Sequence, residues 1–177
     1  DCLLSPRVNK LVLTKRIGNV RRMVPSRWLT NGWPAHVWLG ISVVHREEML
    51  RDASKLAELP VAVKFWSYEP ALGPLGEIPA ELMPSWGIAG GESDQAGHKA
   101  RAAHPQWFRD MRDQFATAGR PWLFKQWGEY LPVGQVRAPG AELVVPRTGH
   151  AWEDGTKAWR IGKAAAGRLL DGRHAGA

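Results

Sequence analysis

Residues 61–70 read Val61-Ala62-Val63-Lys64-Phe65-Trp66-Ser67-Tyr68-Glu69-Pro70, a hydrophobic run that ends abruptly in polar residues. Short runs rich in β-branched and aromatic residues are typical of strands that are buried on both faces, as in parallel sheets. Four other runs have the same form, and each is followed by polar residues or glycine: Lys10–Leu13, Val37–Ile41, Trp86–Ala89 and Trp122–Phe124. The recurrence predicts a parallel sheet of about five strands.

Helical spacing occupies much of the sequence between these runs. Arg46–Leu59 and Pro105–Ala118 carry apolar residues at three- and four-residue intervals, and Arg16–Val24 is a shorter, more basic candidate helix. Pro70–Ser85 is too rich in proline and glycine for a regular helix beyond Ala80–Met83. Strands that alternate with helices predict an α/β fold with right-handed crossovers, which we interpret as a partial β/α barrel.

The sequence changes character near residue 129. We therefore expect a partial parallel β/α barrel in residues 1–129 and a C-terminal extension, packed on it, in residues 130–177. Within the extension, residues 143–145 are apolar enough for a strand, and residues 149–155 resemble a turn before a second strand at 158–161. This pattern predicts a small hairpin, and residues 162–170 predict a final short helix.

The composition excludes several classes of protein. A chain of 177 residues with 44% hydrophobic residues can bury a sizeable core. It contains neither an apolar stretch near the roughly 18 residues of a membrane-spanning helix nor a secretory signal pattern, so we expect no membrane partner and a cytoplasmic location. Cys2 is the only cysteine, which excludes an intramolecular disulfide, and we predict no metal site within the chain.

Five strands do not close a β/α barrel, and the chain begins with Asp1. We therefore expect a fragment of a longer protein. A chain that lacks its first strands would expose an unpaired sheet edge, and unpaired edges promote aggregation. The isolated chain is accordingly predicted to be marginally soluble.

The net charge of +7 is unevenly distributed along the chain. Basic residues crowd the beginning, at Arg7, Lys10, Lys15, Arg16, Arg21, Arg22 and Arg27. They also crowd the end, at Lys157, Arg160, Lys163, Arg168 and Arg173. Two interpretations stay open: a solvated basic surface, or a surface that attracts nucleic acid or another phosphorylated partner.

Polar residues follow each predicted strand, and the carboxyl ends of parallel strands meet at one edge of a sheet, where ligands bind. We therefore predict a site at this edge, with Glu69, Glu92 and Lys125 as its catalytic candidates. The candidate substrate- or cofactor-binding residues are Thr14, Lys15, Arg16, Ser42, Ser67, Gly90, Gly91, Ser93 and Gln126.

Each of these groups has a structural alternative. Gly90 and Gly91 allow a ligand to approach the backbone closely, or they form an ordinary tight turn. Glu69, which lies between Tyr68 and Pro70 after an aromatic strand end, suits general acid–base chemistry if it is buried, or else a cap or salt bridge. Lys125 follows a buried strand and requires a counter-charge, for which Glu69 and Glu92 are the candidates. The pairing is then either a structural ion pair or a clamp for carboxylate or phosphate.

Several motifs are informative in combination. They are Leu13-Thr14-Lys15-Arg16, Val37-Trp38-Leu39-Gly40-Ile41-Ser42-Val43, Ser67-Tyr68-Glu69-Pro70-Ala71-Leu72-Gly73-Pro74, Gly90-Gly91-Glu92-Ser93, His104-Pro105-Gln106-Trp107 and Phe124-Lys125-Gln126-Trp127-Gly128-Glu129. Their order and spacing resemble an uncharacterised family of phage- and prophage-associated bacterial proteins, a domain of unknown function. The resemblance covers nearly the whole chain, including an ending at Arg160-Ile161-Gly162-Lys163 and Leu169-Leu170-Asp171-Gly172-Arg173.

The resemblance to this family also implies a fold and cofactors. Members of that family carry an upstream cysteine cluster similar to that of radical S-adenosylmethionine enzymes, and they share the partial β/α barrel of those enzymes. It therefore implies S-adenosylmethionine and a [4Fe-4S] cluster as cofactors of the full-length protein, with the strand-end residues lining the pocket. Cys2 stands alone, so no cluster ligand is assigned. Val44 also departs from the acidic residue expected at its position, and Gly90-Gly91-Glu92 follows too late a strand to be the amino-group site of radical enzymes.

Three hypotheses follow. The first is the C-terminal part of a radical S-adenosylmethionine-like enzyme of unknown substrate, acting on nucleic acid or another phosphorylated molecule. The second is a non-catalytic, basic, phage-related protein that binds nucleic acid. The third is a degenerate remnant. Three closely spaced cysteines encoded upstream of Asp1 would favour the first hypothesis over the second.

Overall fold

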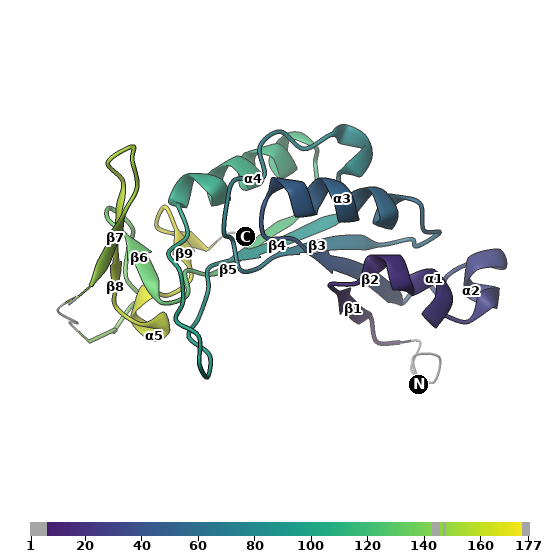
Figure 1. The fold of residues 1–177 in the computed structure, drawn as a ribbon, viewed down its shortest axis with the longest axis horizontal. Coiled ribbons are helices and arrows are strands. Elements are labelled where there is room, and N and C mark those ends of the chain that lie inside the picture. Colours follow the sequence, from purple (N-terminus) through teal and green to yellow (C-terminus); the bar gives the residue numbers. More distant parts are fainter. Residues whose placement is uncertain (1–6, 143–145, 147, 175–177) are drawn as a thin grey trace.

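The computed structural model describes residues 7–142, 146 and 148–174. Its centre is a five-stranded parallel sheet in the order β1-β2-β3-β4-β5 (Figure 1). The strands are β1 (Lys10–Thr14), β2 (Val37–Ser42), β3 (Lys64–Tyr68), β4 (Trp86–Gly90) and β5 (Trp122–Gln126). Their spatial order follows the chain order, as it does along an arc of a β/α barrel. The α/β class and the five-stranded parallel sheet predicted from the sequence are confirmed.

The connections place the long helices on one face of the sheet. Helix α3 (Arg46–Ala57) joins β2 to β3, and α4 (Pro105–Thr117) joins β4 to β5. Each strand is added next to the previous one in the same direction across the sheet, so right-handed crossovers place every connecting helix on the same face. Helices α3 and α4 lie together on that face (Figure 1). The other connections hold only short helices: η1 (Ile17–Asn19), α1 (Val20–Met23) and α2 (Ser26–Thr30) before β2, and η2 (Ala80–Leu82) before β4.

The start of α4 shows how local sequence sets a helix. Pro105 occupies the first turn, where its missing N–H is not needed, and His104 Nδ1 accepts a hydrogen bond from the Gln106 N–H. The helix then buries Phe108, Met111 and Phe115 against the sheet.

The core between this helix and the sheet is aromatic. The Phe108 ring lies 6.1, 5.0 and 5.4 Å from the rings of Tyr68, Phe124 and Trp127. Trp66 packs edge-on against Phe115 of the same helix. Because side chains alternate along a strand, Trp66 and Tyr68 face the helices while Ser67 faces the opposite side.

We call that opposite side the open face and define it by Leu11, Leu13, Trp38, Trp86 and Leu123. Leu11, Leu13 and Leu123 are 45, 49 and 40% exposed, although parallel sheets are usually covered on both faces. Trp38 and Trp86 pack edge to face, and with Leu123 they line a cavity of about 410 Å³. The open face is therefore the least buried apolar surface of the sheet.

The C-terminal extension forms two small antiparallel sheets. The first contains β6 (Tyr130–Pro132), β7 (Gly149–Ala151) and β8 (Lys157–Arg160) in the order β6-β8-β7. The second is the hairpin of β9 (Leu169–Leu170) and β10 (Arg173–His174), which follows helix α5 (Lys163–Ala166). No helix in the described part of the chain is long and apolar enough to cross a membrane.

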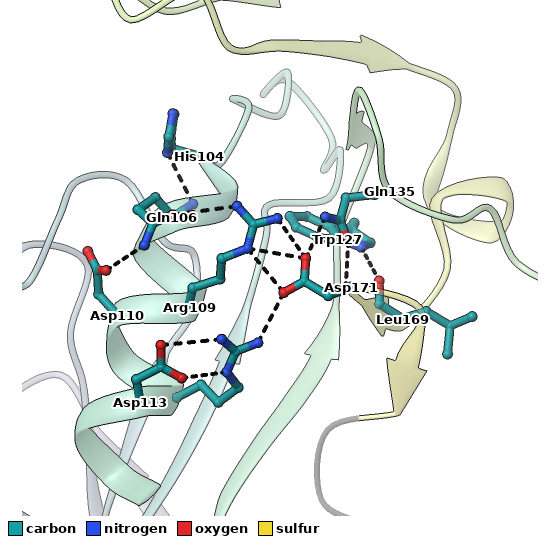
Figure 2. A network of polar contacts seen from close by, with 10 residues as sticks. His104, Gln106, Arg109, Asp110, Asp113, Trp127, Gln135, Leu169 and Asp171 are labelled. Carbon is teal, nitrogen blue, oxygen red and sulfur yellow. Dashed lines mark hydrogen bonds and ion pairs between the residues drawn. The ribbon is translucent and has the colours of Figure 1, made fainter. Parts of the chain in front are cut away.

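Trp127 and Asp171 attach the extension to the sheet and to α4. Trp127 donates from its backbone N–H to the Gly167 carbonyl at 3.1 Å and from Nε1 to the Leu169 carbonyl at 2.8 Å. Figure 2 shows Asp171 accepting hydrogen bonds from Arg109 of α4 and from Gln135. An arginine one turn further along α4, Arg112, reaches the same carboxylate at 3.0 Å.

Several element boundaries differ from the sequence predictions. The helix expected at Arg16–Val24 is divided into η1 and α1, and α2 after Pro25 was not predicted. The strand expected from residue 61 begins at Lys64. The final helix, expected to reach residue 170, ends at Ala166 because Gly167 has a φ of +73° and the chain turns into β9. A C-terminal hairpin is confirmed as β7–β8, but its first strand occupies residues 149–151, which the sequence pattern assigned to the turn, because the chain turns only at Trp152–Gly155, where the Gly155 N–H donates to the Trp152 carbonyl. The strand suggested at 143–145 lies outside the described residues.

The exposed edge of the sheet at β1 predicts a measurable aggregation tendency. Leu13→Lys places a charge on this edge and should lower light scattering of the concentrated protein, while its stability changes by no more than about 0.5 kcal/mol. Val133→Lys, at a 60% exposed residue outside the sheet, is the matched control. Equal improvement by both variants would show that net charge, not the edge, controls solubility.

Candidate ligand site at the carboxyl edge of the sheet

Glu69 and Lys125 form an ion pair at the carboxyl edge. Lys125 Nζ lies 3.2 Å from Glu69 Oε1 and 3.3 Å from Oε2. Glu69 follows β3 directly and Lys125 belongs to β5, so the pair spans the intervening strand β4. The Lys125 side chain is 55% exposed and that of Glu69 is 16% exposed. The predicted meeting of these two residues is therefore present in the structure, with the ammonium open to solvent.

The two glycines at the end of β4 make this crossing possible. A Cβ atom on Gly90 would lie 2.6 Å from Glu69 Oε1, so any side chain there would displace the carboxylate. A Cβ on Gly91 would lie 1.8 Å from the Trp127 carbonyl oxygen. The space above both glycines is thus occupied by the chain's own atoms, and their role in this structure is close packing.

Hydroxyl groups of neighbouring strands complete the surroundings of Glu69. Ser67 Oγ donates to Glu69 Oε2 at 3.2 Å, and Ser42 Oγ donates to the Glu69 backbone carbonyl at 3.4 Å. On the helix side of β3, the buried Tyr68 donates to the Gly73 carbonyl, and burial raises the pKa of its hydroxyl. The loop after β3 is therefore fixed on both sides of Glu69.

Glu92 does not join this pair. Its carboxylate accepts hydrogen bonds from Arg101 Nε at 2.8 Å, from Arg101 Nη2 at 2.7 Å and from the Arg101 backbone N–H at 2.8 Å. His98 Nε2 lies 3.1 Å from the same group. The hydrogen bonds from the Arg101 side chain are the largest cause that lowers the pKa of Glu92 to about 2. Of the two partners suggested for Lys125, the structure selects Glu69, and Glu92 organises the loop between β4 and α4.

The same loop is attached to the C-terminal extension. Arg160 of β8 reaches Asp94 Oδ2 at 2.5 Å and Glu129 Oε2 at 3.8 Å. Asp94 also accepts a hydrogen bond from the Ala100 N–H, which together with Arg160 lowers its pKa to about 2. These contacts hold the loop over the end of β5.

Gln126 fixes the segment that contains Ser93. Its Nε2 donates to the Gly91 carbonyl at 3.3 Å and to Ser93 Oγ at 3.5 Å, and the side chain is buried. Gln126 and Ser93, both predicted binding residues, are brought together here as a structural contact beneath the loop.

The remaining predicted residues lie at the other end of the sheet. Thr14 Oγ1 accepts a hydrogen bond from the Arg16 N–H, while Lys15 and Arg16 are exposed. Two strand spacings, about 10 Å measured along the sheet, separate β1 from β3, which Glu69 follows, and four spacings, about 19 Å, separate β1 from β5, which contains Lys125. The β1 cluster therefore does not contact the Glu69–Lys125 pair.

Comparisons with known proteins identify the family. A family model described as a protein of unknown function, DUF5131, matches residues 2–177. The chain belongs to the DUF5131 family. No curated protein and no solved structure matches it.

Sequence reasoning missed the residues that hold the site of this DUF5131 protein together. Arg101 and Arg160 select the orientation of Glu92 and Asp94, yet they lie nine and 66 positions away in the chain. No local spacing pattern in the sequence predicts such pairs, since each pair depends on the folded conformation of the loop between β4 and α4. The described residues contain no group of three or more His, Cys, Asp or Glu side chains suited to a metal ion.

The Glu92 contacts predict a pH-dependent contribution to stability. Because the pKa of Glu92 is lowered from 4.5 to about 2 on folding, this contribution is complete above pH 4.5 and is lost as the pH falls towards 2. Glu92→Gln should lower the free energy of unfolding by about 1 to 2 kcal/mol at pH 7, measured by urea denaturation. The difference from the unmodified protein should shrink below pH 4.5.

Glu81→Gln, at an exposed acid of η2, provides the control and should change stability little at any pH. A difference between the Glu92→Gln variant and the unmodified protein that stays constant from pH 7 to pH 3 would contradict the assigned role.

Proposed function

We propose that the Glu69–Lys125 pair is the polar part of an enzyme's ligand site and that it binds the zwitterionic head group of an α-amino-acid-type ligand. In this arrangement Lys125 holds the α-carboxylate and Glu69 accepts hydrogen bonds from the α-ammonium group. S-adenosylmethionine, which the motif resemblance implies, carries such a head group. This DUF5131 protein would then be part of a radical S-adenosylmethionine-like, phage-associated enzyme.

The observation that carries the proposal is the reach of Glu69 across β4. An exposed ion pair contributes only about 0 to 1 kcal/mol to stability, so folding alone gains little from it. Yet the pair requires a glycine at position 90, a carboxylate held by Ser67, and a lysine whose end stays in solvent. Because the ion pair is weak, Glu69 and Lys125 can separate, and each can bind the opposite charge of a ligand at a small cost in free energy.

The position of the pair supports the same conclusion. Ligands of parallel α/β proteins bind beyond the carboxyl ends of the strands. Glu69 follows β3 at this edge, and Lys125 is one residue from the end of β5. The open face lies on the side of the sheet to which Ser67 points, so a ligand can approach without displacing α3 or α4.

The two implied cofactors fit this chain differently. The head-group chemistry of S-adenosylmethionine matches Glu69 and Lys125, and the cofactor supplies a reactive sulfonium centre when it is bound. A [4Fe-4S] cluster requires several cysteine thiolates, and the chain contains one cysteine. These residues therefore do not form a cluster site, and we assign this chain only the binding and orientation of the ligand.

If Lys125 binds the ligand carboxylate, its substitution should affect only ligands that carry this carboxylate. The unmodified protein should bind S-adenosylmethionine about tenfold or more tightly than decarboxylated S-adenosylmethionine, measured by titration calorimetry. Lys125→Gln should remove this discrimination, since it removes the cation that the carboxylate contacts. Lys55→Gln removes the exposed lysine of another ion pair, with the buried Asp52 on α3, and should preserve the discrimination. If Lys125→Gln weakened both ligands equally, Lys125 would not contact the carboxylate.

Gly90→Ala tests the geometry of the pair without removing either charge. The added methyl group would lie 2.6 Å from Glu69 Oε1 and should displace the carboxylate, which lowers ligand affinity. Gly18→Ala is the matched control, because a Cβ at that position meets nothing within 4 Å. Unchanged affinity in the Gly90→Ala variant would exclude Glu69 from ligand binding.

The radical class needs a separate experiment. The longest protein that the gene encodes should form an iron–sulfur cluster on anaerobic reconstitution with iron and sulfide and should then cleave S-adenosylmethionine. Absorbance spectra and product analysis measure the two steps. Failure to form a cluster would exclude the radical S-adenosylmethionine class. The Glu69–Lys125 pair, which we call the zwitterion site, would then be tested by the binding measurements alone.

A further inference from the structure

Two adjoining cavities lie on either side of the β9–β10 hairpin. The larger, about 750 Å³, lies between the end of α4, the start of β5 and the hairpin, and Arg120 and Arg173 line it. The smaller, about 520 Å³, lies between the end of β5, α5 and the hairpin, and Lys163 and Arg168 line it. His174 lines both cavities. We call the two cavities together the C-terminal cleft.

The hairpin itself explains why the cavities adjoin. Arg173 lies opposite Leu170 and His174 opposite Leu169, so the two cross-strand pairs point to opposite faces of the hairpin. Asp171 and Gly172, with φ of +54° and +75°, form the tight turn between the strands. The hairpin is therefore a ridge with one cavity on each face.

The C-terminal cleft contains four exposed cations. Arg120, Lys163, Arg168 and Arg173 are exposed and have no carboxylate partner among the described residues. By contrast, Arg101, Arg109 and Arg160 are paired with Glu92, Asp171 and Asp94. Arg160, one of the cations that the sequence grouped at the C-terminal end, thus belongs to the loop contacts.

The acids that line the cleft are already neutralised. Asp171 accepts hydrogen bonds from Arg109, Arg112 and Gln135, and the contact with Arg109 is the main cause that lowers its pKa. Asp113 is bound to Arg112 Nε at 2.8 Å. The four unpaired cations therefore determine the electrostatic potential of the cleft.

We propose that the C-terminal cleft binds a single strand of nucleic acid, whose successive phosphates contact Arg120, Arg173, Arg168 and Lys163. Four unpaired cations, two in each adjoining cavity, match a regularly charged backbone, and their neutralisation releases counterions. The walls between the cations are apolar and include Pro121 and Leu170 in the larger cavity and Pro139 and Leu169 in the smaller. Each cavity has the volume of a small-molecule site, which suits one unstacked nucleotide of a single strand, whereas the paired and stacked bases of a duplex are not free to enter.

The inference is independent of the zwitterion site, because none of its cations contacts Glu69 or Lys125. Loss of nucleic-acid binding would leave the proposed function untouched, and loss of S-adenosylmethionine binding would leave the cleft untouched.

The experiment measures the binding of a fluorescein-labelled 20-nucleotide oligo(dT) by anisotropy at several salt concentrations. Four phosphate contacts predict a slope of log K against log salt of about −3, and each contact removed should reduce the slope by about 0.7. Arg168→Gln and Arg173→Gln should each weaken binding about fivefold at 0.1 M salt, and the double variant about 25-fold. Lys157→Gln, an exposed cation of β8 outside the cleft, should leave the affinity nearly unchanged.

Two results would overturn the proposal. If Lys157→Gln weakened binding as much as Arg168→Gln, net charge rather than the cleft would hold the strand. If poly-glutamate of equal charge bound as tightly as oligo(dT) and responded to the same variants, the cleft would bind an acidic protein segment instead. A matched 20-base-pair duplex should bind more weakly than the single strand, and the opposite order would exclude entry into the cavities.

Discussion

The end of β4 lacks side chains at two successive positions, and the whole carboxyl edge depends on that absence. Gly90 leaves room for Glu69 to cross β4 and reach Lys125, and Gly91 leaves room for the Trp127 carbonyl to approach. The first contact creates the charged pair of the site. The second sets where the chain leaves β5, and therefore where the C-terminal extension begins. One pair of glycines thus positions both the ligand site and the extension.

Trp127 connects the carboxyl edge of the sheet to the hydrophobic core and to the C-terminal extension. Its ring packs on Phe108 and Phe124, so it belongs to the core between the sheet and α4. Its two N–H groups donate to Gly167 and Leu169, so it also holds α5 and the β9–β10 hairpin. A buried tryptophan combines a large apolar surface with a polar handle, and both parts are used here. The extension and the sheet therefore share one hydrophobic core.

The sequence predicted the long elements better than the short ones for physical reasons. The helix beginning at Pro105 has a periodic apolar pattern and the strands are continuous apolar runs, and both patterns indicate burial. By contrast, η1 and α1 are single turns set by tertiary contacts. The carboxyl edge was predictable because parallel strands share a direction. The choice of Glu69 over Glu92 as the partner of Lys125 was not, because Arg101 captures Glu92 only after the loop folds. Ion pairs within and between loops follow no periodic pattern in the sequence and therefore cannot be predicted from residue spacing.

The arrangement of charges along β5 connects the two proposed sites. The smaller cavity of the C-terminal cleft reaches Gln126 at the carboxyl end of the strand, and the larger reaches Trp122 at its amino end. A strand of five residues spans about 13 Å, so the two cavities adjoin opposite ends of β5. The Glu69–Lys125 pair has no net charge and attracts an anion only at short range, whereas the cations of the cleft act at a distance. The cleft would therefore draw a charged strand to the protein from a distance, whereas the Glu69–Lys125 pair would hold a zwitterionic ligand only once that ligand had reached it.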